Sequence, residues 1–309
     1  MKRGFTLIEM IFVVVISAIL SLGAFKAMEA LYLRSARAKA VTELSLRSQV
    51  ALDQLAALLY QRIPNSAIGY LKDGTTATCK ALEEIDGEYR ILEWLAMDES
   101  NLTAGRYDGF VDLQESGRDT LKASDLNKSA MGDSSAFNLI FAGSFDAGDE
   151  TLEACEGAFG WHGHDSNLSF DISISSDDNI TITDSVEPDF IYEKYYLTRG
   201  AYAVARGDDV DVGQCSDLPF DPADLNLKTT LFLFYGYRPW AGKTFCGDKM
   251  ESDASKREGH VTILAEEVAG FWADTVNGAI RLRLDMNRTI RGGNGGGKVV
   301  HITKQKVVF

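Results

Sequence analysis

The chain has 309 residues, of which 45% are hydrophobic and 25% are charged, and its formal net charge is −14. This acidity argues against nucleic acid as a partner, because binding to phosphates requires a basic surface. One apolar segment at the N-terminus leaves about 250 residues beyond it, which suffices for one large or two small domains. We expect one.

The apolar segment runs from Phe5 to Phe25 and contains a single charged residue, Glu9. A lone carboxylate in a membrane-spanning segment costs several kcal/mol on insertion scales and marks a functional site. An ordinary secretory signal has its small-residue cleavage site after the apolar run, whereas here the small residue, Gly4, precedes it. Cleavage after Gly4 would remove residues 1–4 as a leader peptide and keep the apolar run. It would also free the amine of Phe5, the obvious cation for Glu9 of a neighbouring subunit.

The order of a basic leader, Gly4, Phe5 and Thr6-Leu7-Ile8-Glu9 resembles the class III signal of type IV pilins and type II secretion pseudopilins. The resemblance implies that a prepilin peptidase cleaves after Gly4 and methylates the amine of Phe5, and that Glu9 serves methylation and subunit docking. An uncleaved single-pass anchor, with Glu9 reaching towards the headgroups, is the alternative interpretation.

The same resemblance implies a location and partners. The precursor would be stored as a single-pass protein in the bacterial inner membrane with a periplasmic domain, and would then enter a filament in the periplasm or at the cell surface. The implied partners are other pilins or pseudopilins of that filament, the prepilin peptidase and an inner-membrane assembly platform.

The charges beside the apolar run conflict with this orientation. Lys2 and Arg3 favour a cytoplasmic N-terminus, but further cations lie just beyond the other end of the run, where the positive-inside rule expects few. These cations are Lys26, Arg34, Arg37 and Lys39. We give the processing signal more weight, because the basic stretch lies on a helix that a filament would pack against its neighbours.

Helical periodicity continues past the apolar run, with apolar residues at intervals of three, four and seven from Leu31 through Val41 to Ile63. Pro64 ends the pattern, because proline disfavours helix in the residue before it. We therefore predict one helix of about 90 Å, at 1.5 Å per residue, with a membrane segment at 5–25 and an amphipathic continuation at 26–63. Since a bilayer is much thinner, the second half must lie outside and bury its apolar side on an exported domain of residues 64–309.

Strand patterns dominate from Phe137 onward. Residues 168–174 alternate between apolar and polar, turn at 175–179 and resume at 180–182, which predicts a hairpin with one buried face. Residues 280–286 alternate in the same way, and a glycine-rich stretch at 292–297 separates them from a last strand at 299–309. Further predicted elements are strands at 189–196, 202–205, 229–237 and 260–264, and a short helix near 81–85.

The expected fold is therefore α+β and pilin-like: a long N-terminal helix, embedded in the membrane over its first half, packed on an antiparallel β-sheet domain. All four cysteines, Cys79, Cys155, Cys215 and Cys246, lie in the part expected to be exported. An even number there suggests two disulfides, for which three pairings are possible. Sequence proximity favours Cys215 with Cys246, which leaves Cys79 with Cys155.

Two groups of residues offer metal ligands. Asp208, Asp209 and Asp211 could supply oxygen ligands to calcium, although a solvated acidic loop is the simpler interpretation, and no other cofactor is expected. His162 and His164 would need further ligands from elsewhere in the fold, and the glycines beside them favour a surface turn.

No catalytic arrangement such as Gly-x-Ser-x-Gly or His-Glu-x-x-His occurs, so we do not expect an enzyme. Aromatic residues between Tyr192 and Trp240 could line a ligand groove, but such residues on strands are more often core. Residues 264–268, ahead of Phe271 and the last hairpin, resemble the C-terminal part of large minor pseudopilins, particularly the J subunit, and of W-type minor pilins. Position 26 is Lys, where many major pilins of the family have a helix-kinking proline.

The sequence therefore predicts a minor subunit of a type IV pilus or type II secretion filament, processed by prepilin peptidase and assembled through its N-terminal helix. Two alternatives stay open, a filament-borne adhesin or receptor and an uncleaved membrane-anchored binding domain.

Overall fold

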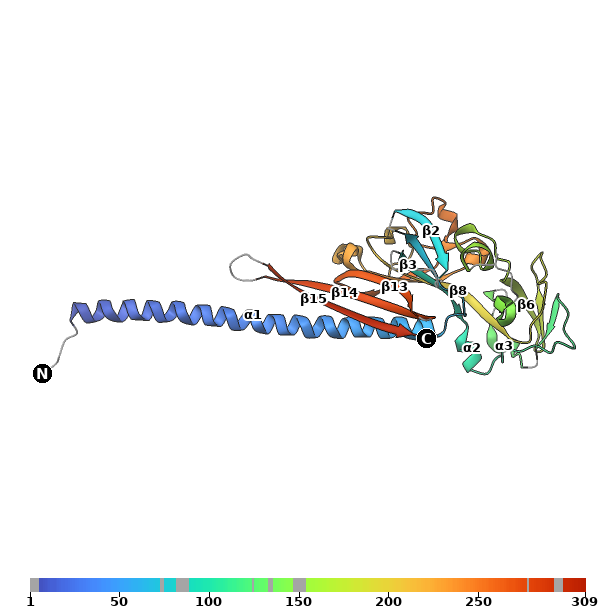
Figure 1. Ribbon diagram of the computed structural model, residues 1–309, viewed down its shortest axis with the longest axis horizontal. Helices are drawn as coiled ribbons and strands as arrows, with labels where there is room; N and C mark the ends of the chain where they lie inside the picture. The colour runs from blue at the N-terminus through green and yellow to red at the C-terminus, as the bar shows by residue number, and fades with distance from the viewer. Residues whose placement is uncertain are drawn as a thin grey trace.

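The structure is a computed structural model that describes residues 6–72, 75–81, 89–123, 125–132, 136–146, 154–276, 278–291 and 297–309. A long helix, α1 (Leu7–Tyr60), leads from the N-terminus into a domain made mainly of strands (Figure 1). The predicted α+β class, with a long N-terminal helix and an antiparallel sheet, is confirmed. Gly4 and Phe5 lie outside the described residues.

The helix α1 has 54 residues, which corresponds to about 80 Å at 1.5 Å per residue. It ends at Tyr60, slightly before the predicted Ile63, and the amide of Gln61 donates to the carbonyl of Leu58 in a last tight turn. Residues 6–28 are exposed throughout, whereas the second half buries one side on the domain. The buried residues are Ala40, Leu44, Ser48, Ala51, Leu52, Leu55, Ala56 and Leu59.

Three residues of the predicted apolar side, Leu31, Ala38 and Val41, are exposed instead of buried. Leu31 is 64% exposed and Val41 is 41% exposed. The domain covers only the side of α1 that carries Ala40 and Leu44, and its cover begins beyond Leu31. The predicted apolar stripe was therefore too long, because periodicity alone does not show where the domain ends.

Ten of the described strands form one large sheet, which branches at β8 (Tyr195–Arg206). One edge of β8 pairs with β3 (Tyr89–Met97), which continues to β1 (Ile68–Lys72) and β2 (Thr76–Ala81). The other edge pairs first with β5 (Asn138–Phe141) and then with β9 (Leu231–Tyr237). Strands β6 (Phe170–Ser176), β7 (Asn179–Ile182) and β4 (Thr120–Lys122) extend the β5 branch, and β12 (His260–Ala265) extends the β9 branch. Short helices α2 (Glu99–Thr103) and α3 (Lys128–Met131) lie in the connections.

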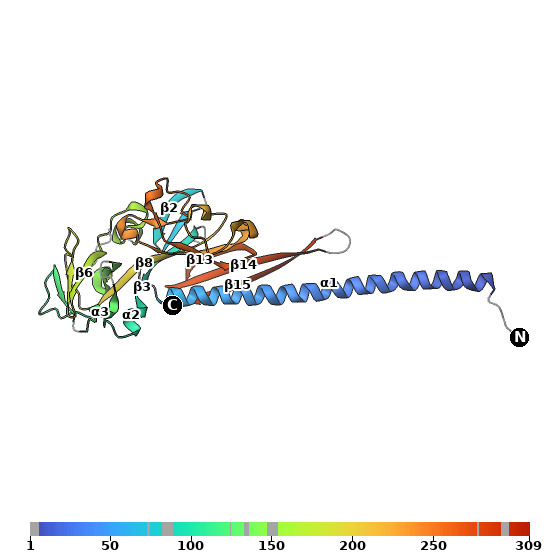
Figure 2. The ribbon, with the colours of Figure 1, turned by 180° about the vertical axis from the view of Figure 1, so that it is seen from behind.

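A second antiparallel sheet contains β13 (Val268–Val276), β14 (Ala279–Arg291) and β15 (Gly297–Val308). The β14–β15 hairpin lies alongside α1 and reaches back towards the N-terminus of the helix (Figures 1 and 2). The predicted alternation is confirmed, since the side chains of Ile280, Leu282, Leu284 and Met286 are fully buried. A short parallel pair is formed by β10 (Thr244–Phe245) and β11 (Arg257–Glu258).

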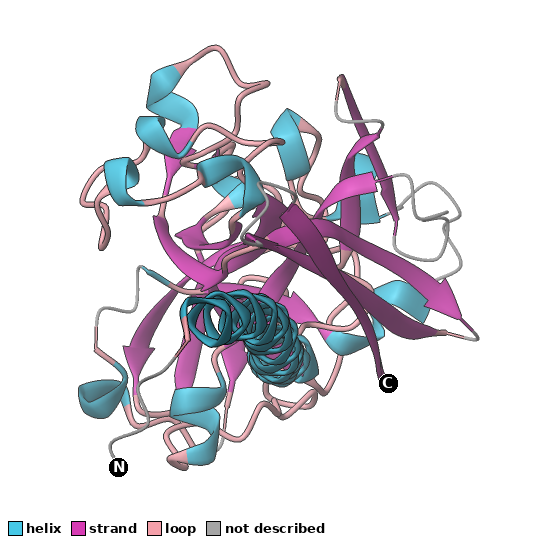
Figure 3. Cartoon of the chain, turned by 90° about the vertical axis from the view of Figure 1, so that its left-hand side faces the viewer, coloured by secondary structure: helices cyan, strands magenta, loops and turns pink. Residues whose placement is uncertain are grey.

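Viewed along α1, the helix lies end-on against the strands (Figure 3). Its buried side forms one core with β13–β15 and one face of the large sheet, including Trp94 and Leu233. The opposite face of the large sheet carries a second core around Phe232 and Phe234, and β4–β7 enclose a third. The helix is therefore fixed to the domain by its second half alone.

The predicted hairpin at 168–182 and the strand at 260–264 are confirmed as β6, β7 and β12, and the strand at 229–237 is found as β9. The strand predicted at 202–205 is found within β8, whereas of the strand predicted at 189–196 only Tyr195 and Tyr196 belong to it, and β8 joins both segments by running through Gly200. Gly200 lies so close to Gly236 that an added Cβ would be 3.0 Å from its Cα, so the glycine serves close packing of two strands and not a turn. Of the helix predicted near 81–85, Ala81 ends β2 and the rest lies outside the described residues.

Candidate functional site

The carboxylate of Glu9 lies at the start of α1, where it binds Thr6. Its Oε2 accepts hydrogen bonds from the Thr6 amide at 3.1 Å and from the Thr6 hydroxyl at 2.9 Å. This geometry is that of a capping box, in which the third helical residue satisfies the amide of the capping residue. In the single chain, the hydrogen bonds of Glu9 therefore come from within its own helix.

The first half of α1 presents apolar side chains on every side. Its large hydrophobic residues from Leu7 to Phe25 are 49–81% exposed. A helix that is apolar all round is stable only inside a membrane or among other helices. By length and composition α1 qualifies as a membrane-crossing helix, and none of its most apolar window is buried.

A long N-terminal helix, apolar in its first half and carrying an antiparallel sheet domain on its second half, is the pilin-like architecture. Residues 1–25 match the family model described as the prokaryotic N-terminal methylation motif. The motif supports a type IV pilin-like protein, and it indicates a substrate of prepilin peptidase that assembles into filaments of the pilin kind. Neither the curated proteins nor the solved structures gave a match to this chain.

The motif and the exposed apolar helix together indicate a membrane-anchored precursor, and they point to a structural subunit in place of an enzyme. The matched residues cover only the N-terminal signal. Any more specific role must come from the residues beyond it.

The structure pairs Cys79 with Cys155 and Cys215 with Cys246, the pairing that sequence proximity favours. The Cα atoms are 5.9 Å apart in the first pair and 4.9 Å apart in the second. The first disulfide ties the sheet edge β2 to the helical turn Ala154–Ala158, and the second ties the segment after Gln214 to the end of β10. Both therefore fasten irregular segments on the face of the large sheet opposite α1.

The calcium candidates do not form a site. Asp208 lies 3.9 Å from both Arg206 and Lys228, and Asp211 accepts a hydrogen bond from the amide of Gly213 at 3.1 Å. Burial raises the pKa of Asp209, which opposes the charged form that a calcium ligand needs. Among the residues that the structure describes, no group of three or more His, Cys, Asp or Glu could hold a metal ion. We therefore do not propose calcium binding.

The surface turn expected at 160–165 is wrong for His162, whose side chain is 11% exposed. Its Nε2 donates to Oε1 of Glu93 at 2.8 Å, and its Nδ1 lies 3.6 Å from Oδ2 of Asp248. The imidazole also stacks on the ring of Tyr70, with centroids 3.5 Å apart, and the hydroxyl of Tyr237 donates to Oε2 of Glu93 at 2.6 Å. His162 itself has a left-handed backbone, with φ of 50°, which these contacts hold in place.

Burial by itself would lower the pKa of His162, but the charge of Glu93 and the hydrogen bonds to Asp248 and Glu93 outweigh it and raise the pKa to about 9. Burial likewise opposes the charge of Asp248, yet the hydrogen bond and charge of His162 prevail and lower the pKa of that carboxyl. The cluster is thus an imidazolium held between two carboxylates inside the domain. No periodic signal in the sequence could have shown it, since its members come from distant segments.

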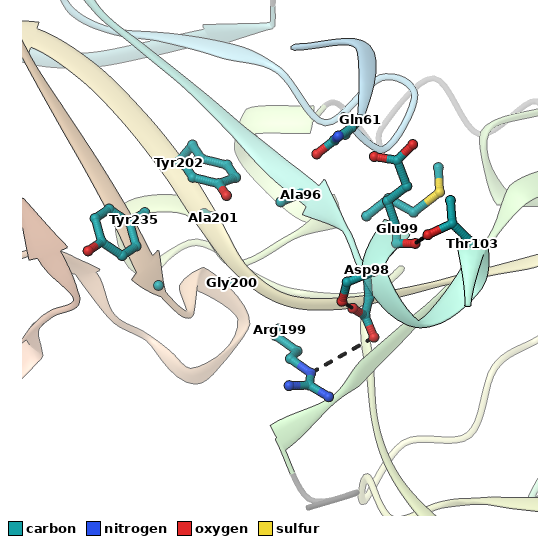
Figure 4. Close-up of a pocket in the computed structure, with 13 residues that line it drawn as sticks. Gln61, Ala96, Asp98, Glu99, Thr103, Arg199, Gly200, Ala201, Tyr202 and Tyr235 are labelled. Carbon is teal, nitrogen blue, oxygen red and sulfur yellow. Dashed lines mark hydrogen bonds and ion pairs between the residues drawn. The ribbon is translucent and has the colours of Figure 1, made fainter. Parts of the chain in front are cut away.

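A cleft of about 400 Å³ opens where the large sheet branches (Figure 4). Asp98, Arg199, Tyr202 and Tyr235 contribute to its lining. Nε of Arg199 is 3.9 Å from Asp98, and its Nη2 donates to the carbonyl of Met131 at 2.7 Å. The ring of Tyr202 stacks on that of Trp94 with centroids 5.5 Å apart, whereas Tyr235 is 38% exposed. Of the aromatic residues considered for a groove, Phe232, Phe234 and Tyr237 are core instead.

Proposed function

We propose that this chain is a minor subunit of a type IV pilus or type II secretion filament, cleaved after Gly4, methylated at Phe5 and assembled through α1. One observation carries the proposal. The exposed apolar surface of Leu7–Phe25 contains one carboxylate, Glu9, and continues without a break into a helix half that is packed on its own domain. Such a surface requires cover, and a membrane followed by a filament core would cover it in turn.

Glu9 would act by exchanging partners. In the single chain it accepts hydrogen bonds from Thr6. In the filament it would instead pair with the freed Phe5 amine of a neighbouring subunit, because both charges would otherwise be unpaired in an apolar core. The ion pair would set the axial position of each new subunit, while Leu7 and Ile8 supply the apolar contact.

Two features favour a minor over a major subunit. The described residues that follow α1 form a ten-stranded sheet, a three-stranded sheet and a short parallel pair, a large domain for a repeating filament subunit. Lys26 lies within α1, which continues through this position, where a kinking proline is typical of major pilins. The subunit would remain in the inner membrane as a precursor until an assembly platform extracts it.

The deciding experiment is intact-mass and N-terminal analysis of the protein purified from its own membranes, beside a Gly4→Ile variant. We expect a mature chain that starts at methylated Phe5, and an unprocessed variant. A wild-type chain that still starts at Met1 would contradict the proposal and leave an uncleaved, membrane-anchored binding domain.

The branch-point cleft favours a second candidate, a filament-borne receptor. Tyr235 and Tyr202 offer partly accessible rings beside the Asp98–Arg199 pair, a combination that suits a polar ligand with one flat apolar face, such as a sugar. A glycan array probed with the full-length chain and with Tyr235→Ala tests this. Binding that the variant loses would support a receptor, and no binding by the wild type would exclude sugars.

A further inference from the structure

A second cleft, of about 520 Å³, lies between α1 and the β14–β15 hairpin. Arg34 and Arg37 enter it from consecutive turns of the helix, and Lys298 enters it from the start of β15. Leu33, Ile290 and Val300 supply apolar walls between the cations. We call this feature the basic cleft.

The cations of the basic cleft lack the ion pairs that two other cations of the hairpin form with α1 and its surroundings. Arg288 binds both Glu43 and Glu267, and Lys306 binds Asp53, so these residues fasten the hairpin to α1. By contrast, Arg34, Arg37 and Lys298 form no ion pair with any of the described residues. Three unpaired positive charges converge on one apolar-walled space, and such an arrangement attracts an anion.

The position of the basic cleft suggests where that anion comes from. Arg34 follows Phe25, the end of the apolar segment, by nine residues, which is about 14 Å along the helix axis at 1.5 Å per residue. Helical side chains lean towards the N-terminus, here towards the membrane, and long arginine side chains reach for headgroups. The hairpin brings Lys298 to the same cleft as Arg34 and Arg37.

We propose that the basic cleft binds the phosphate headgroup of an anionic phospholipid in the leaflet that faces the domain. The inference rests on the membrane-stored precursor of the proposed function. The cations would hold the phosphate, while Leu33, Ile290 and Val300 form apolar walls that exclude water around the headgroup. This accounts for basic residues on the side of the membrane where the positive-inside rule expects few.

A phospholipid fits the basic cleft better than an acidic segment of a neighbouring subunit does. The apolar walls suit a headgroup whose glycerol esters are partly withdrawn from water but offer nothing to a solvated carboxylate. The lipid is also present before any neighbour arrives. The site would hold the domain upright over the membrane until the subunit is extracted.

The test uses the full-length chain in nanodiscs of phosphatidylcholine, with and without phosphatidylglycerol. Native mass spectrometry after release counts the lipids that each chain retains. The test variant combines Arg34→Gln, Arg37→Gln and Lys298→Gln, all at exposed positions. A control variant removes the same charge from exposed sites in the domain, Lys128→Gln, Lys194→Gln and Lys249→Gln.

We expect the wild type and the control to retain phosphatidylglycerol at least five-fold over phosphatidylcholine, and the test variant to lose this preference. Equal retention of both lipids by the wild type, or an unchanged preference in the test variant, would overturn the proposal. Displacement of the lipid by inorganic phosphate at millimolar concentration, or retention of a second copy of the chain in place of lipid, would also overturn it. N-terminal processing is measured separately, so a processed chain without lipid preference refutes this inference alone.

Discussion

His162 and Glu93 form a buried ion pair, with Nε2 of the imidazole 2.8 Å from Oε1 of the carboxylate, although 69 residues separate them in the chain. The pair links the loop that starts at Gly160 to the central strand β3. Glu93 is fully buried, so the loss of its partner would leave a charge without compensation in the core of the sheet.

This pair predicts a pH dependence of stability. The pKa of His162 is about 9 in the folded chain, against an ordinary value near 6.5 in the unfolded chain. Because the folded value is raised, the stabilisation is complete below about pH 6.5 and is lost as the pH rises through 9, on the order of 3 kcal/mol in total. Urea unfolding of the full-length chain in detergent, followed by Trp fluorescence at several pH values, measures it.

The matched variants for this prediction are His162→Gln and His164→Gln. We expect His162→Gln to be less stable than the wild type at pH 6.5, with a free energy of unfolding that hardly changes up to pH 9. The exposed His164→Gln should show the same loss of stability with rising pH as the wild type. A wild-type stability that does not change between pH 6.5 and 9 would show that His162 is neutral in the folded state.

Substitution of Glu9 should impair filament assembly but not folding. Glu9→Val should leave cleavage after Gly4 largely intact and reduce incorporation into filaments at least ten-fold, because the Phe5 amine would have no partner in the apolar core. The measurement is the ratio of subunit in sheared filaments to subunit in membranes. Thr6→Val is the control, since it removes only the intramolecular hydroxyl donor to Glu9. Normal incorporation of Glu9→Val would count against the proposed mechanism.

The ion pairs of Arg288 should stabilise the packing of the β14–β15 hairpin on α1. Its guanidinium binds Glu43 of the helix and Glu267 of the turn before β13, so Arg288→Gln should lower the free energy of unfolding by about 1–2 kcal/mol. The amide hydrogen exchange rates of β15 should also be higher in this variant than in the wild type. Arg281→Gln is the matched control, because it breaks the pair with Asp274 inside the same sheet without touching α1. Equal increases in the hydrogen exchange of β15 in both variants would show that Arg288 does not specifically hold the hairpin on α1.

The two disulfides predict that denatured, unreduced protein contains no thiol that reacts with a titrating reagent. They also predict that the double variant Cys215→Ser, Cys246→Ser loses about 3–4 kcal/mol of stability, because this disulfide closes a loop with a sequence separation of 31. Four reactive thiols in protein purified from its own membranes would contradict both statements. The Cys79–Cys155 pair, with a separation of 76, should contribute at least as much.

Local patterns in the sequence determined the elements that depend on neighbouring residues. The apolar run, its single Glu9 and the periodicity up to Ile63 predicted the long helix, and the alternation at 280–286 predicted β14 with its buried face. These predictions succeed because side-chain direction repeats every 3.6 residues in a helix and every two in a strand. The processing signal can also be read from the sequence, because a peptidase recognises a short continuous segment.

Only the tertiary structure decided what the distant segments form together. It placed His162 between Glu93 and Asp248, where the sequence favoured a surface turn, and it carried β8 through Gly200 because Gly236 of β9 packs against it. It also brought Lys298 to Arg34 and Arg37. The physical reason is that burial and charge pairing depend on strand register and on how the hairpin lies along α1, and no spacing within a single segment contains that information.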